Sequence, residues 1–329
     1  MLGSIRALLH LMVIPGTLAS MPAAARAGGP VDLEALRDAD RAVLTVGYRL
    51  ATSAVRLCPK PVPALGLELH DLGQYGIQYR AAAAGRFGLG RWPGVLALAQ
   101  GGQAANAGVR EDDAVVAVDG SEVPAEQGFA RVQVALRQID EAARRGAVEL
   151  DLRRRGQDVQ VWIQPTPACP THFQTRPSSD MQARADGSIV EITTGLVGFT
   201  HGADELAAVL AHELAHNILH HRESLAAAGA SRGLLRIFGR SARLIRDTED
   251  EADRLSVYLV DRAGYRPSAI LLFWQRFRHT PGALLDATHA PDAKRVATIS
   301  AEIGRLETLK RAGVDPLSTL LQRSSLPPG

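Results

Sequence analysis

The chain has 329 residues, which is more than one small domain needs and enough to bury a sizeable core. Its 37 basic and 35 acidic residues nearly cancel, and no block of like charge stands out. This balance excludes the electrostatic footprint of a nucleic-acid-binding protein. We therefore expect two folded domains behind a targeting segment and no nucleic-acid partner.

The first 27 residues have the features of a secretory signal peptide. Arg6 supplies the positive start, an apolar run extends from Ala7 to Ile14, and small residues end the segment. The apolar run is short and contains His10, which favours a cleaved signal peptide over an uncleaved membrane anchor. We expect a periplasmic or otherwise exported protein, either free or associated with the membrane.

Residues 28–63 are expected to form an N-terminal helix and a linker. Apolar residues recur at helical spacing between Asp32 and Leu57, and several prolines follow. The two cysteines of the chain, Cys58 and Cys169, favour a disulfide in an exported protein. The alternative is a pair of free buried thiols.

Residues 64–165 have a different sequence pattern, which predicts short apolar strands, Gly-rich turns and one helix. The run from Ala104 to Gly120 has the pattern A-x-x-A-G-h-x-x-x-D-x-h-x-x-h-x-G, where h is apolar. It resembles the corresponding run of bacterial PDZ domains. The acidic residues 111–113 replace the Gly-Asp pair of that pattern, and residues 88–90 offer a competing Gly-rich loop.

The PDZ resemblance implies a peptide-binding groove. Leu65, Gly66 and Leu67 would form a carboxylate-binding loop, and the strand Leu67–His70 and the helix Gln127–Ala143 would form the two walls. A bound peptide would add one strand to the edge of the sheet. The alternative is a domain that only spaces or shields the rest of the protein.

A linker and a strand lead into the last domain, residues 166–329. The segment between Pro165 and Pro177 has linker composition, and Gly187 marks a turn before an apolar strand. We interpret this strand as the one that pairs with the backbone of an extended substrate. Its residues are Ile189, Val190, Glu191 and Ile192.

The stretch from Asp204 to His221 predicts one buried helix, because apolar residues recur at three- and four-residue spacing without Gly or Pro. His212 and His216 are four residues apart and therefore share a face. Glu213 lies beside them, which gives the H-E-x-x-H pattern of a zinc hydrolase.

Two residues compete for the position of a third zinc ligand. His220 lies on the same helix, but three ligands on successive turns of a straight helix would spread along its axis. Glu249 belongs to the acidic start of a second helix, residues 247–255. The residues alone do not separate Glu249 from Glu251.

Three motifs occur in the order found in one family of metallopeptidases. They are A-D-G-S-I-V-E-I-T-T-G-L from Ala185, the helix from Asp204 to His221, and Glu249-x-x-Ala252-Asp253. Together they resemble the gluzincin zinc metallopeptidases that include HtpX, the yeast CAAX prenyl protease and BepA. The resemblance extends from residue 183 to about residue 300.

This resemblance implies that His212, His216 and Glu249 bind Zn²⁺ and that Glu213 is the general base. Asp253, one turn after Glu249, would hold an imidazole in place, and we assign it to His212.

Residues 287–295 resemble the T-H-P-x-x-x-x-R segment of the same family, with the proline displaced by one position. By analogy, His289 or Arg295 would face the developing oxyanion. The alternative is a plain helix-capping segment. His221 also matches a family position, and we interpret it as structural.

Residues 232–246 form a basic amphipathic segment between the two metal-binding helices, with arginines on one face and apolar residues on the other. Such a segment either covers the cleft as a lid or contacts an anionic membrane surface. We favour the lid because the segment lies next to the metal ligands in sequence.

We therefore expect an α+β protein with a mainly helical zinc metallopeptidase domain that contains a small sheet. A PDZ-like β-sandwich or barrel domain precedes it. The expected function is that of an exported zinc-dependent endopeptidase that cleaves envelope proteins in quality control. The alternatives are a non-proteolytic chaperone or scaffold that binds protein clients through the PDZ-like domain, and a zinc hydrolase of non-peptide substrates.

Overall fold

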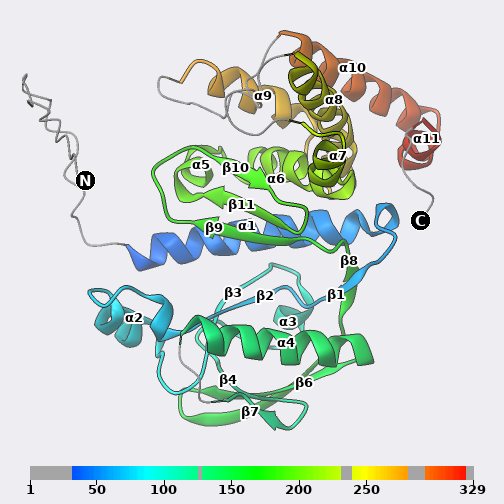
Figure 1. Cartoon of the computed structure of the whole chain (residues 1–329). Coiled ribbons are helices and arrows are strands. Elements are labelled where there is room, and N and C mark those ends of the chain that lie inside the picture. The colour runs from blue at the N-terminus through cyan, green and yellow to red at the C-terminus, as the bar shows by residue number, and fades with distance from the viewer. Residues whose placement is uncertain (1–31, 125–127, 231–238, 281–292, 324–329) are drawn as a thin grey trace, which may run out of the picture. The chain divides into compact units, whose positions relative to one another are not determined.

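The computed structural model describes residues 32–124, 128–230, 239–280 and 293–323. It is an α+β fold with a helical half and a half built around an antiparallel sheet (Figure 1). The two halves have separate apolar cores. The predicted signal peptide lies outside the described residues. Among the described helices, none combines the length and the apolar character that a bilayer span requires.

The long helix α1 (Leu33–Ser53) contributes to the core of the helical half. Its apolar residues recur at helical spacing, and Val46 and Leu50 are fully buried. Gly47, between them, lies against Phe173. A Cβ atom at Gly47 would come within 2.4 Å of Phe173 Cγ. Glycine therefore permits the close contact between α1 and the strand that carries this ring.

A disulfide joins Cys58 and Cys169, whose Cα atoms are 5.4 Å apart. It links the end of the short turn η1 (Val55–Leu57) to the end of strand β8 (Thr166–Ala168). Strand β1 (Val62–Ala64) pairs antiparallel with β8. The segments that lead into and out of the sheet half therefore lie side by side, and the disulfide joins them.

The sheet half has the strand order β2-β3-β4-β6-β7, with β5 paired to β4, and all of these pairs are antiparallel. The strands are β2 (Leu67–His70), β3 (Gly94–Leu98), β4 (Ala114–Val118), β5 (Ser121–Glu122), β6 (Val148–Arg154) and β7 (Gln157–Ile163). The other elements are η2 (Leu72–Gln74), α2 (Arg80–Phe87), α3 (Gln103–Asn106) and α4 (Phe129–Arg145). Burial alternates along β6, as expected for a strand with one face on a core.

The structure contains the strand and the helix that were predicted to form the peptide groove. Strand β2 lies at the edge of the sheet, and α4 contacts it. The expected carboxylate-binding loop, residues 65–67, packs against α1. Gly66 has φ +74°, and a Cβ atom there would come within 3.2 Å of the Tyr48 ring. The PDZ-like identity of residues 64–165 stays a prediction.

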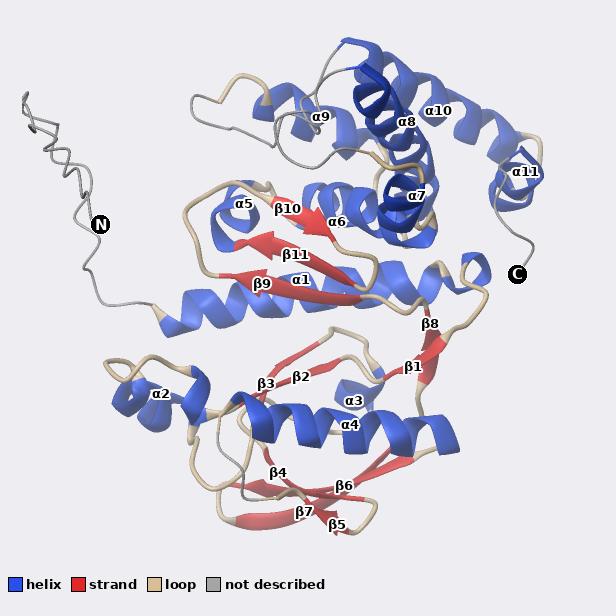
Figure 2. Cartoon of the chain, viewed as in Figure 1, coloured by secondary structure: helices blue, strands red, loops and turns tan. Residues whose placement is uncertain are grey.

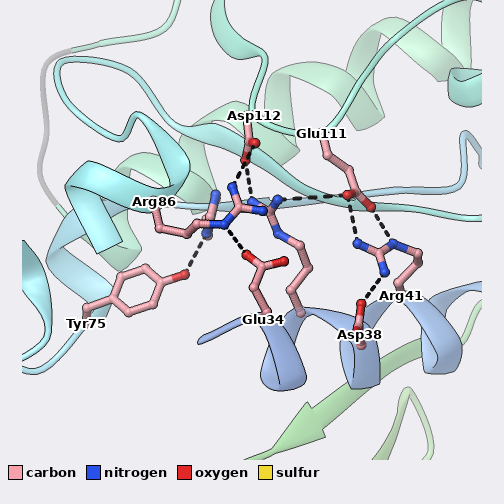
Figure 3. A network of polar contacts seen from close by, with 9 residues as sticks. Glu34, Asp38, Arg41, Tyr75, Arg86, Glu111 and Asp112 are labelled. Carbon is pink, nitrogen blue, oxygen red and sulfur yellow. Dashed lines mark hydrogen bonds and ion pairs between the residues drawn. The ribbon is translucent and has the colours of Figure 1, made fainter. Parts of the chain in front are cut away.

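A network of ion pairs fastens α1 to the acidic turn before β4 (Figure 3). The buried guanidinium of Arg37 pairs with Asp112 and lies 3.8 Å from Glu111. Arg41 donates two hydrogen bonds, of 2.7 and 2.8 Å, to the Glu111 carboxylate. Arg86 of α2 lies 3.5 Å from Asp112. Two of the three acidic residues 111–113, Glu111 and Asp112, therefore bind α1.

Two carboxyl groups near this contact, Asp40 on α1 and Glu68 on β2, have raised pKa values. Burial raises the pKa of Glu68 to about 8, and the charge of Asp40 adds to the rise. Burial also raises the pKa of Asp40 to about 6, although the hydrogen bond from the Thr175 hydroxyl lowers it. The protonated form of Glu68 therefore stabilises the fold. This stability is complete below its ordinary pKa of 4.5 and is lost as the pH rises through about 8.

Replacing Glu68 with Gln, an uncharged group of similar shape, is expected to raise the melting temperature by roughly 2–6 °C at pH 8 and to change it little at pH 4. Thermal unfolding followed by circular dichroism at both pH values measures the effect. Glu141→Gln, at an exposed position on α4, is the matched control. Equal responses of the two variants at pH 8 would mean that ionisation of Glu68 does not destabilise the fold.

The helical half contains a small sheet with the order β10-β11-β9 (Figure 2). Its strands are β9 (His172–Arg176), β10 (Ala183–Ala185) and β11 (Ile189–Thr193). Its helices are α5 (Thr194–Phe199), α6 (Ala203–Ile218), α7 (His221–Ala227), α8 (Gly239–Arg262), α9 (Ser268–Phe277), α10 (Ala293–Arg311) and α11 (Pro316–Arg323). Helix α6 contacts β10, β11, α8 and α9, so it lies at the centre of this half.

The expected substrate-pairing strand, formed by Ile189, Val190, Glu191 and Ile192, is not an edge strand, and this expectation was wrong. These residues form β11, which pairs antiparallel with β10 on one side and parallel with β9 on the other. Their backbone groups already bond to two neighbours. The edges of this sheet belong to β10 and β9.

Two further expectations differ from the structure at helix ends. The helix predicted up to His221 ends at Ile218, and His220 turns the chain with a φ of +51°. Of the basic segment 232–246, only residues 239–246 are described, and they form the first two turns of α8. The choice between a lid and a membrane contact stays open for this segment.

Candidate metal centre

Helices α6 and α8 supply three groups that converge on one point. His212 and His216 lie one turn apart on α6, and Glu249 lies on α8. The Nε2 atoms of the two imidazoles are 3.2 Å apart. Glu249 Oε2 is 3.3 Å from His212 Nε2, and Glu249 Oε1 is 3.5 Å from His216 Nε2. The structure therefore gathers the three predicted ligands into one cluster.

These separations fit a tetrahedral zinc ion. Bonds of about 2.0–2.1 Å from zinc to nitrogen or oxygen place neighbouring ligand atoms about 3.4 Å apart. One ligand atom from each of the three residues lies within 4.8 Å of the others. Three protein ligands leave a fourth position for water or substrate, which is typical of a catalytic zinc site.

The geometry also separates the competing third ligands. His220 is exposed beyond the end of α6 and lies outside the cluster. Glu251, two residues after Glu249, points toward α7, where its Oε2 lies 3.0 Å from His221 Nε2. Glu249 alone among these residues faces both imidazoles. The assignment that depended on the family resemblance therefore has a direct geometric basis.

Asp253 contacts the His212 imidazole on the side that faces away from the cluster. Its Oδ1 lies 3.2 Å from Nδ1 of His212, so the carboxylate holds the nitrogen that does not face the cluster. Burial lowers the pKa of His212, but the hydrogen bonds and charges of Asp253 and Glu249 raise it to about 10. The negative potential of these carboxylates favours a bound cation.

Arg295, on α10, pairs with the carboxylate of Asp253. Its guanidinium is buried and forms two hydrogen bonds to the Asp253 carboxylate, of 2.7 and 2.8 Å. It also lies 3.4 Å from Glu249 and stacks at 4.9 Å on the Trp274 ring. In the structure its guanidinium binds the Asp253 carboxylate, and its role at the oxyanion stays a prediction. His289, the other candidate, lies outside the described residues.

Glu213 is buried on α6 beside His212, as a general base would be. A small pocket reaches both residues and is also lined by Ala183 of β10 and Trp274 of α9. Strand β10 therefore borders the catalytic helix. A much larger cavity, of about 1080 Å³, is lined by α7, α8, α10 and α11 and does not include His212 or Glu213.

The comparisons with known proteins concern the helical half. Residues 166–239 match the model of Peptidase family M48. The chain is also 29% identical over 136 residues to the mitochondrial metalloendopeptidase OMA1 of the fission yeast Schizosaccharomyces pombe. That alignment covers 34% of this chain and 40% of the yeast protein, so the chain matches less than half of its relative's length.

The family match contains His212, Glu213 and His216 and ends before Glu249. It also begins after residues 64–165, so it carries no information on the predicted PDZ-like domain. The fold adds what the match leaves out, because α8 brings Glu249 to the two histidines.

Proposed function

We propose, from the premise that this chain contains the metalloendopeptidase core of family M48, that it hydrolyses peptide bonds inside protein substrates. The observation that carries this proposal is the convergence of His212, His216 and Glu249 with Glu213 alongside. Two imidazoles, one carboxylate ligand and a neighbouring carboxylate base are the groups that zinc-dependent hydrolysis requires.

The residues of the centre have separate roles in this reaction. When bound, zinc would supply Lewis acidity, which polarises a carbonyl and lowers the pKa of a water molecule. His212, His216 and Glu249 would hold the ion, and Glu213 would accept the proton of the attacking water. Glu213 then donates that proton to the nitrogen of the departing amine. The buried position of Glu213 protects the proton transfer from bulk water.

Strand β10 (Ala183–Ala185) replaces β11 as our candidate for holding the substrate. It is an edge strand, and its Ala183 lines the small pocket that contains His212 and Glu213. An extended substrate that adds a strand to this edge would lie along the catalytic helix.

A peptide-binding role for residues 64–165 is a separate proposal. The edge position of β2 and its contact with α4 support it, because a peptide could pair with β2. The packing of Gly66 against Tyr48 opposes capture of a terminal carboxylate at residues 65–67. Binding of clients without cleavage is the alternative function, and it would depend on this half alone.

Export is likewise a proposal for this chain. The disulfide between Cys58 and Cys169 supports it, because structural disulfides persist mainly in oxidising compartments. The signal-like composition of residues 1–27 points the same way. Cleavage of envelope proteins in quality control would then be the biological setting.

The test is cleavage of an unfolded model protein, such as reduced and alkylated casein, by the purified chain. We expect 1,10-phenanthroline to abolish cleavage and stoichiometric Zn²⁺ to restore it after removal of the chelator. The non-chelating isomer 1,7-phenanthroline is the control for nonspecific inhibition. Cleavage that persists in metal-free protein would contradict a zinc peptidase, and binding of casein without any cleavage would favour the scaffold alternative.

A further inference from the structure

A second polar chain leads away from the metal centre through His221. Because His220 turns the chain after α6, His221 opens α7 and its ring folds back toward α6. His221 Nδ1 lies 2.9 Å from His216 Nδ1, and the two rings are inclined at 74°. On its other side, His221 Nε2 lies 3.0 Å from Glu251 Oε2. The ring is buried, with 3% of the residue exposed.

The positions of the nitrogens fix the direction of these hydrogen bonds. His216 Nε2 faces His212 and Glu249, so it is the nitrogen available to a metal and carries no proton when it binds one. His216 must then carry its proton on Nδ1 and donate it. His221 Nδ1 therefore accepts, and the proton of His221 lies on Nε2, from which it is donated to the Glu251 carboxylate.

We propose that His221 and Glu251 are positioning residues that hold the His216 imidazole in its metal-binding tautomer and orientation. This inference rests on the proposed zinc site. It gives His216 a support of the same kind that Asp253 gives His212, with an imidazole inserted between the ligand and the carboxylate.

The carboxylates of Asp253 and Glu251 lie in different environments, and each environment stabilises the charged form. Asp253 is buried and receives the guanidinium fork of Arg295. The Glu251 side chain is 57% exposed and lines the cavity of about 1080 Å³, so water can solvate its outer side. A buried anion needs a paired cation, whereas a hydrated one does not.

Helix α8 can serve both ligands because its acidic residues lie on two faces. Glu249 and Asp253 are four residues apart and share the face toward α6. Glu251 lies between them in sequence and therefore points to another face, where it reaches α7. One helix thus supplies a metal ligand and a support for each of the two imidazoles.

The test is a measurement of Zn²⁺ affinity by competition with a chromophoric chelator, made on metal-free full-length protein. We expect His221→Ala to weaken Zn²⁺ binding by about 10- to 100-fold, because His216 loses the acceptor for its Nδ1 proton. His221→Asn is expected to stay within about 3-fold of the parent, since the Asn Oδ1 occupies nearly the place of the His Nδ1. Glu251→Gln, which keeps an acceptor but removes the charge, should fall between them.

His220→Asn is the control, because it changes the exposed neighbouring histidine and keeps a residue that tolerates positive φ. Unfolding of each metal-free variant is followed by circular dichroism, which separates lost affinity from lost fold. Unchanged affinity in folded His221→Ala, or equal losses in the Ala and Asn variants, would overturn the proposal. A parent protein that binds Zn²⁺ but cleaves nothing would instead defeat the proposed function and leave this inference standing.

Discussion

Replacing Glu213 with Gln is expected to lower kcat/KM for casein cleavage by roughly 10²- to 10⁴-fold while Zn²⁺ stays bound. Gln has nearly the shape of Glu but cannot accept a proton from water. The three ligand side chains, His212, His216 and Glu249, are unchanged, so metal content should remain that of the parent. The measurements are initial rates on labelled casein and zinc content by mass spectrometry on the same preparations.

The control for this prediction is Glu307→Gln, an equivalent change at an exposed position on α10. It should leave both the rate and the zinc content unchanged. A Glu213→Gln protein that cleaves at the parental rate would show that another group accepts the proton. Loss of zinc together with activity would show that Glu213 supports the metal rather than the water.

Replacing Arg295 with Met is expected to lower the free energy of unfolding by about 3–5 kcal/mol, because the Asp253 carboxylate loses its cation while it stays buried. The volume of the side chain is largely kept, so the effect comes from charge more than from packing. The same change should weaken zinc binding, since Asp253 holds His212. Urea unfolding of the metal-free protein and chelator competition measure the two effects.

Arg295→Lys and a double variant make this prediction specific. Lysine keeps the positive charge but loses the fork that binds both oxygens of Asp253, so we expect a smaller loss of stability. The double variant Asp253→Asn, Arg295→Met removes both charges, and its destabilisation should be smaller than the sum of the single effects. Strict additivity of the two changes would mean that the ion pair makes no net contribution.

The catalytic helix could be predicted from sequence because its signals are local. The four-residue spacing of His212 and His216 places them on one face, and Glu213 follows directly. The end of the helix was misplaced, because no Gly or Pro marks the turn at His220, which adopts a positive φ as a non-glycine residue. That turn brings His221 back to His216, a contact that helical periodicity alone would not predict.

The long-range partners could not be predicted from local patterns. Glu249 and Glu251 belong to the same acidic run, and only the packing of α8 on α6 shows that the first faces the histidines. Arg295 lies 42 residues after Asp253 in sequence, and its pairing depends on the position of α10. The motif around Arg295 therefore gave no sign that this residue binds Asp253.

Strand order was the other point at which sequence was insufficient. The strong β-pattern of residues 189–193 correctly indicated a strand, but it did not show that both sides of this strand are paired. Its edge partner β10 has only three residues, Ala183–Ala185, and too little pattern to be recognised. The acidic residues 111–113 similarly gave no sign that two of them bind arginines on α1.

Zinc content and zinc coordination in matched variants test the central claim most directly. We expect one Zn²⁺ per chain in the parent and in His220→Asn, and strongly reduced zinc in Glu249→Gln after dialysis against a weak chelator. X-ray absorption of the parent should show two imidazole nitrogens and carboxylate oxygen at about 2.0–2.2 Å. Full zinc retention in Glu249→Gln, or loss of zinc in His220→Asn, would contradict a centre formed by His212, His216 and Glu249.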